Sequence, residues 1–174
     1  MNYPTDSEMF TVACLVNTPA WLIPEQAKKA TQDLFTDDRA AIVIGALIHL
    51  SHEENQPDDE PIRFQVLDRY LKESGLYSKM GTPLAEWVRE LVTVRYAHSC
   101  QFDSAVYDLI SDALHREINN AIGELREADL LKPDGEYVQW YDAHGQRIKE
   151  LDRRRTACLP DPRCTPPNAK KMRG

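Results

Sequence analysis

The sequence lacks a long apolar run and a glycine-rich loop, and its first residues do not predict a secretion leader. Its longest apolar stretch, residues 40–48, is nine residues long, about half of the ~18 that a membrane-spanning helix needs. No cationic segment of the kind that opens a secretion signal stands at the N-terminus. The seven glycines stand singly, so the sequence predicts no phosphate-cradling loop. We expect a cytoplasmic protein without a membrane partner.

Motifs for catalysis or metal binding are equally scarce. The four cysteines are too scattered for a disulfide scaffold and are interpreted as reduced thiols: Cys14, Cys100, Cys158 and Cys164. His49 and His52 have a spacing that can bring two imidazoles to one metal, but a third ligand is missing. Neither a nucleophile elbow nor a set of kinase motifs is present. We therefore expect no enzyme, no metal and no cofactor.

The composition is that of an ordinary globular protein. The chain has 174 residues, 42% of them hydrophobic and 28% charged, enough for one sizeable core. We expect one globular domain over residues 1–155, helical over 24–130 with a β-hairpin over 136–151. Residues 156–174 are basic and rich in proline, which predicts a flexible tail.

Helical spacing and capping residues predict several helices in the first two thirds of the chain. Thr36 can cap a nearly all-apolar helix over residues 37–51. Pro61 opens a helix that Gly75 ends. Thr82 and Pro83 begin another helix, with its apolar side chains on one face. Residues 1–23 have no clear period and are left open between strand and helix.

Residues 115–131 predict a further amphipathic helix. Its apolar positions repeat at helical spacing and indicate a buried stripe of Ile118, Ala121, Ile122, Leu125 and Leu130. Residues 109–113 would form a support helix before it. No glycine separates the two in residues 112–115, so whether residues 104–129 form one helix or two stays open.

A short β-hairpin is predicted after that helix. Residues 132–135, Lys-Pro-Asp-Gly, favour a turn, and residues 137–141 are aromatic and prone to form a strand. Residues 142–145, Asp-Ala-His-Gly, are then a hairpin turn, and residues 147–149 the returning strand. Helix, helix and hairpin in this order resemble the winged helix-turn-helix superfamily, and the MarR group in particular, over roughly residues 84–155.

The resemblance implies a mainly α fold with a C-terminal winged helix that binds duplex DNA. It suggests a transcriptional regulator or an accessory replication factor, and it allows a homodimer. Asparagine is the residue type that pairs with adenine, while arginine reads guanine or holds phosphate. Side chains on the wing would track the DNA backbone. The implied DNA-binding residues are Arg116, Asn119, Asn120, Arg147, Lys149, Arg153, Arg154 and Arg155.

The C-terminal end of the chain is basic and the remainder is acidic, and the two charges favour different functions. From residue 146 onward nine Lys/Arg stand against three Asp/Glu, whereas the whole chain carries −7. The basic end favours contact with nucleic acid. The acidic body, and the carboxylates at 117, 124, 127 and 129 in the predicted recognition helix, favour a different function. The alternative is an acidic adaptor or inhibitor, of the kind that phages and mobile elements encode, that binds a basic nucleic-acid-handling protein.

Overall fold

The fold is a helical body that carries a long helical hairpin. The computed structural model describes residues 6–53, 59–94, 97–127 and 134–158, and every regular element in these ranges is a helix. The α-helices are α1 (Asp6–Val16), α2 (Ile23–Ala27), α3 (Asp38–Ser51), α4 (Phe64–Glu73), α5 (Leu76–Met80), α6 (Thr82–Leu91), α7 (Phe102–Glu127) and α8 (Asp134–Ala157). Three short 3-10 helices are η1 (Ala20–Leu22), η2 (Gln32–Leu34) and η3 (Ser99–Gln101). The mainly α part of the predicted fold is confirmed.

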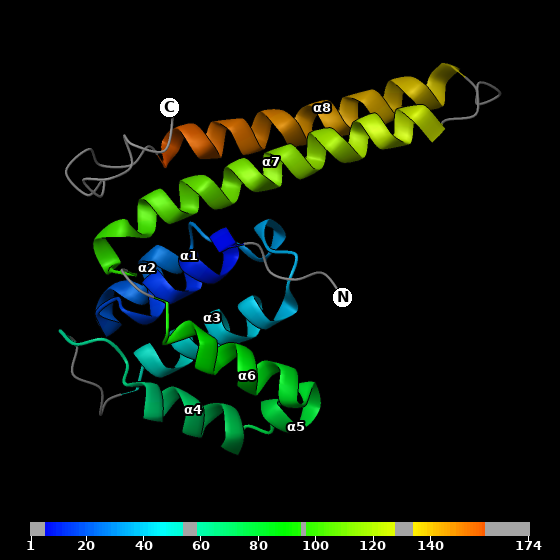
Figure 1. The fold of residues 1–174 in the computed structure, drawn as a ribbon. Coiled ribbons are helices and arrows are strands. Elements are labelled where there is room, and N and C mark those ends of the chain that lie inside the picture. The colour runs from blue at the N-terminus through cyan, green and yellow to red at the C-terminus, as the bar shows by residue number, and fades with distance from the viewer. Residues whose placement is uncertain (1–5, 54–58, 95–96, 128–133, 159–174) are drawn as a thin grey trace, which may run out of the picture.

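Helix α1 lies at the centre of the body. Residues 12–16 are all buried, and α1 packs against α3, α6 and α7. A helix that is apolar on every side shows no period in its sequence, because every face is covered. That is why residues 1–23 gave no clear prediction. Figure 1 shows α1 enclosed between α7 on one side and α3 on the other.

Helices α3 and α6 begin close to the positions predicted from their capping residues. Asp37 rather than Thr36 caps α3, and its side chain accepts from the backbone N–H of Arg39 at 2.9 Å. The Arg39 guanidinium pairs with Asp37 and lies 5.7 Å from the centre of the Trp87 ring, which ties α3 to α6. The expected apolar face of α6 is buried at Leu84, Trp87, Val88 and Leu91.

The predicted pair of support and recognition helices is wrong, because α7 is continuous from residue 102 to 127. Nothing in residues 112–115, Asp-Ala-Leu-His, obliges the chain to leave a helix. Leu109, before the supposed turn, and Leu114, within it, are both buried against the body. Residues 128–130 lie outside the described part of the chain.

The predicted β-hairpin over residues 136–151 is also wrong, because α8 runs through it from residue 134 to 157. The supposed turn, residues 142–145, is helical, and the described residues form no strand. Trp140, His144, Ile148 and Leu151 recur at intervals of four, four and three, a helical repeat. Packing of this face against α7 outweighs the strand propensity of the aromatic residues.

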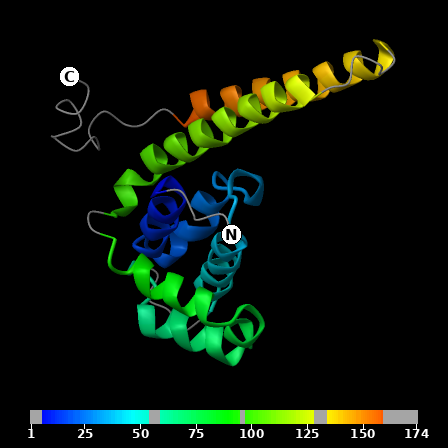
Figure 2. The same ribbon diagram turned by 45° about the vertical axis from the view of Figure 1, so that its right-hand side comes forward.

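Helices α7 and α8 lie side by side and antiparallel, and the hairpin they form projects from the body. In both views the N-terminal half of α7 lies on the body, while the end where α7 stops and α8 begins extends away from it (Figures 1 and 2). Among the side chains that the structure describes, the last buried one of α7 is Leu114, and the buried apolar one of α8 is Leu151. We call residues 117–127 and 134–146 the distal hairpin.

Gly145 offers a test of the helical assignment of α8. A Cβ added there meets nothing within 4 Å. We expect Gly145→Ala to raise the free energy of unfolding by roughly 0.5–1 kcal/mol, because alanine loses less backbone entropy in a helix. Gly75→Ala is the control: its φ of 74° should make alanine destabilising there. Chemical denaturation measures both, and a loss of stability in Gly145→Ala would speak against the helix.

Candidate interaction surface

Arg116, expected to read DNA, is a structural residue in the fold. Its guanidinium donates to the carbonyl oxygen of Leu34 and lies 3.7 Å from the carboxylate of Glu8, which is completely buried. Glu8 also accepts from the backbone N–H and the hydroxyl of Thr36, at 2.9 and 2.8 Å. Arg116 therefore fastens the middle of α7 to α1 and to the segment before α3.

Two further residues of the predicted wing hold α8 to the body. Asp33 contacts Arg147 at 2.5 Å and Arg154 at 3.1 Å, and Arg154 also donates to Thr31. Partial burial alone would raise the pKa of Asp33. The hydrogen bonds from Thr31 and the two arginines outweigh that effect and lower the pKa to about 2. Much of the positive charge of α8 is thus matched within the chain.

The remaining predicted DNA-binding residues lie on α7 and α8, and two of them form ion pairs within α8. Arg153 pairs with Glu150 at 2.8 Å, and Arg155 pairs with Asp152 at 2.6 Å and lies over the ring of Tyr107. Lys149 is exposed and has no ion pair within the described ranges. Asn119 and Asn120 are exposed on α7, in the distal hairpin. The structure brings Arg147 and Arg154 together at Asp33.

The interface between the helices of the distal hairpin is polar. His144 of α8 lies 2.6 Å from Glu117 and 3.3 Å from Glu124, both on α7. Trp140 donates from its indole nitrogen to Glu124 at 2.5 Å, and its ring lies 4.6 Å from that of His144. A neutral imidazole has one N–H, so only the protonated ring can donate to both carboxylates. The hydrogen bond to Glu117, together with that to Glu124, raises the pKa of His144 above its ordinary value of 6.5.

Apolar side chains lie on the outside of the distal hairpin instead. The expected buried stripe on α7 is wrong at two positions, since Ile122 is 44% and Leu125 53% exposed. On α8, Val138 is 61% and Tyr141 71% exposed. We call Ile122, Leu125, Val138 and Tyr141 the distal apolar surface. An apolar cluster of this kind on a projecting element is typical of a contact surface.

A hollow of about 260 Å³ lies within this surface. It is lined by Leu125 from α7 and by four side chains of α8, namely Tyr137, Val138, Trp140 and Tyr141. Its volume is below the ~300 Å³ where small-molecule sites begin. A hollow of this size suits an apolar side chain of another protein. The sequence does place apolar residues three apart at 122/125 and at 138/141, which is a helical interval. The first pair was interpreted as part of the core and the second as part of a strand.

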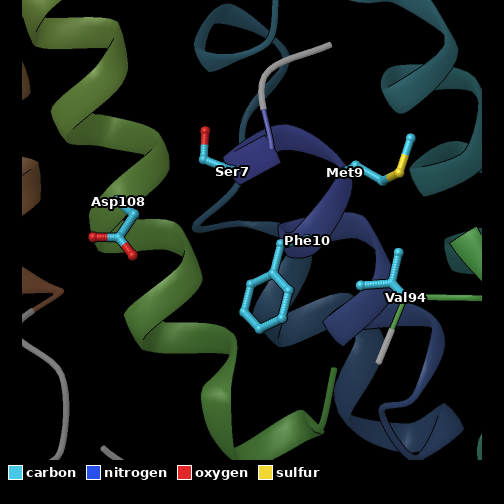
Figure 3. Close-up of a pocket in the computed structure, with 5 residues that line it drawn as sticks. All are labelled: Ser7, Met9, Phe10, Val94 and Asp108. Atoms are coloured by element: carbon cyan, nitrogen blue, oxygen red, sulfur yellow. The ribbon is translucent and has the colours of Figure 1, made fainter. Parts of the chain in front are cut away.

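A second hollow, of about 410 Å³, lies between α1 and α7. Ser7, Met9, Phe10, Val94 and Asp108 line it, and Figure 3 shows their side chains pointing in different directions rather than toward one centre. The Ser7 hydroxyl is already engaged, because it donates to Asp112 at 2.5 Å. This hollow therefore offers little polar chemistry for a ligand.

The sequence candidates for metal and thiol chemistry are not assembled into sites. His49 stacks on Tyr70 and lies 3.8 Å from Glu53. Within the part of the chain that the structure describes, no group of three potential ligands could hold a metal. Cys14 is buried, which is the main reason why its pKa is raised to about 12, so its thiol is unreactive near neutral pH.

Comparisons with known proteins add no family to this description. No protein-family model, no curated protein and no solved structure matches the chain. The resemblance to winged-helix proteins therefore has no support from a relative, and the wing itself is absent from the described residues. Among the described helices, none combines the length and the apolar character required to cross a membrane.

Replacing Arg116 tests whether it anchors α7 or faces a ligand. Arg116→Ala leaves the Glu8 carboxylate buried without its cation. We expect the free energy of unfolding to fall by about 2–4 kcal/mol. Asn119→Ala, at an exposed position of the same helix, should stay within about 0.5 kcal/mol of the parent. Urea denaturation separates the two outcomes, and equal stability of both variants would contradict the anchoring role.

The contacts of His144 predict a pH dependence of the distal hairpin. Because the folded-state pKa is raised, the stabilisation is fully present below the unfolded pKa of about 6.5 and is lost as pH rises through the folded pKa. Hydrogen exchange over residues 134–146, corrected for the intrinsic rate, should show less protection at pH 8.5 than at pH 6. His144→Gln should remove this difference. If the variant keeps the same dependence, the contacts to Glu117 and Glu124 do not stabilise the hairpin.

Proposed function

We propose that the chain is a non-enzymatic adaptor or inhibitor that binds another protein through the distal hairpin. The observation that carries the proposal is the distal apolar surface, four large apolar side chains that are between 44% and 71% exposed on an element projecting from the body. Leaving such side chains in water forgoes the stabilisation that their burial would give. A partner that covers them recovers it.

The charge of the distal hairpin favours a protein partner over a nucleic acid. Residues 117–127 and 134–146 contain six Asp/Glu and one Arg. Carboxylates repel phosphates, so this end of the molecule is poorly suited to a duplex. It suits a basic protein surface, as in the adaptor hypothesis. We place this activity in the cytoplasm as part of the proposal, because Cys14, Cys100 and Cys158 are free thiols.

Binding of DNA is the second candidate, carried by the basic C-terminal end rather than by a winged helix. Lys149 and Arg153 are exposed, and the excess of Lys/Arg from residue 146 onward supports it. Because Arg147 and Arg154 are paired with Asp33, contact would depend on the exposed positions and on the residues after 158. Such binding would be independent of sequence and sensitive to salt.

Photo-crosslinking in the cells that make the protein tests the adaptor proposal. A photoreactive amino acid at Val138 should give a discrete crosslinked heterologous protein, and the same group at Lys72, exposed on α4, should not. Adding Tyr141→Ser should abolish the crosslink and change stability by no more than about 0.5 kcal/mol, because Tyr141 is 71% exposed. Absence of a crosslink at Val138, together with salt-sensitive binding of a fluorescent duplex, would replace the adaptor with the DNA candidate.

A further inference from the structure

The distal apolar surface has an elongated pattern that matches a helix. Ile118, Ile122 and Leu125 follow one another at intervals of four and three along α7, and Val138 and Tyr141 are three apart on α8. Ile118 still packs against the core, so the row on α7 leads from the body outward. At about 1.5 Å per residue it extends for roughly 10 Å, or two turns.

Acidic side chains border this row. Asp142 is exposed on α8, one residue after Tyr141 and four after Val138. Glu124, next to Leu125 on α7, keeps 55% of its side chain exposed while it contacts Trp140 and His144. Arg126 is the one basic residue of the distal hairpin apart from the histidine. Charge complementarity therefore calls for Lys or Arg on the occupant, on either side of its apolar residues.

We propose that the occupant is a basic amphipathic helix of the partner protein, which lies along α7 and α8 and completes a three-helix arrangement. This inference rests on the proposed adaptor function and names its partner class. Apolar side chains at helical spacing would cover Ile122 and Leu125 and enter the 260 Å³ hollow beside Tyr141. Lysines and arginines on the flanks would face Asp142 and the exposed part of Glu124.

The same charges disfavour the other occupants. In a two-fold dimer centred on the distal apolar surface, the same acidic patch of both copies enters the interface. Six Asp/Glu on each distal hairpin make that arrangement repulsive. A duplex is repelled for the same reason, and a partner with an acidic helix would also lack complementarity.

Three synthetic peptides of 18 residues are the probes. The first contains leucines at positions i, i+3, i+4 and i+7 and lysines elsewhere, the second has the same composition in an order that destroys the spacing, and the third has glutamate in place of lysine. Fluorescence anisotropy with the full chain measures each affinity. We expect the ordered lysine peptide to bind at least about tenfold more tightly than either control, a difference of 1.4 kcal/mol.

Variants of the chain locate the binding. Leu125→Ser and Tyr141→Ser should each weaken the ordered peptide severalfold, with unchanged helix content by circular dichroism. The variant Asp142→Lys should reduce the preference for lysine over glutamate. Its matched control, Glu73→Lys, makes the same change of net charge at an exposed position of the body and should leave the preference intact.

Each other outcome has a definite meaning. Equal binding of the ordered and scrambled peptides overturns the helix proposal, and a crosslink at Val138 would then leave the adaptor function standing. An equal effect of the two charge reversals shows unspecific attraction and overturns it as well. A concentration-dependent dimer in sedimentation that Tyr141→Ser dissolves makes a second copy the occupant. Peptide binding as expected without a crosslink contradicts the adaptor function alone.

Discussion

Glu8 joins three segments that are far apart in the sequence. Its buried carboxylate accepts two hydrogen bonds from Thr36 and faces Arg116, whose guanidinium also holds the carbonyl of Leu34. The arrangement sets where α7 leaves α1, because a buried charge tolerates little displacement of its partner. Asp33 tethers α8 in the same region. The distal hairpin, which lies beyond both tethers, is supported by its own two helices.

The sequence predicted helices where local signals decide the outcome. The helix over 37–51 and the one from Thr82 were found within a residue or so, because capping residues and an apolar period mark them. The prediction of a wing is wrong for a physical reason. Residues 142–145 suit a turn, yet they also fit a helix once α7 covers one face of α8. Propensity over four residues carries too little energy to decide against packing over twenty-four.

The candidate site was the least predictable part. Nothing around Arg147 or Arg154 reveals that Asp33, more than a hundred residues earlier, lies opposite them. The positive charge of Arg147 and Arg154 was therefore interpreted as a contact with DNA. In the fold, Asp33 of the same chain is their partner. Likewise the stripe through Leu125 predicted burial, because an apolar period is the same whether the chain or a partner covers it. The identity of the covering surface is a property of the whole fold.

The division between a polar interface and an apolar exterior in the distal hairpin has an evolutionary consequence. Ile122, Leu125, Val138 and Tyr141 contribute little to the core, since each keeps between 44% and 71% of its surface in water. His144, Glu117 and Trp140 keep the two helices aligned from the inside. Mutations on the exterior can therefore accumulate with little loss of folding stability. A chain built in this way can change its partner by a few substitutions while its body stays the same.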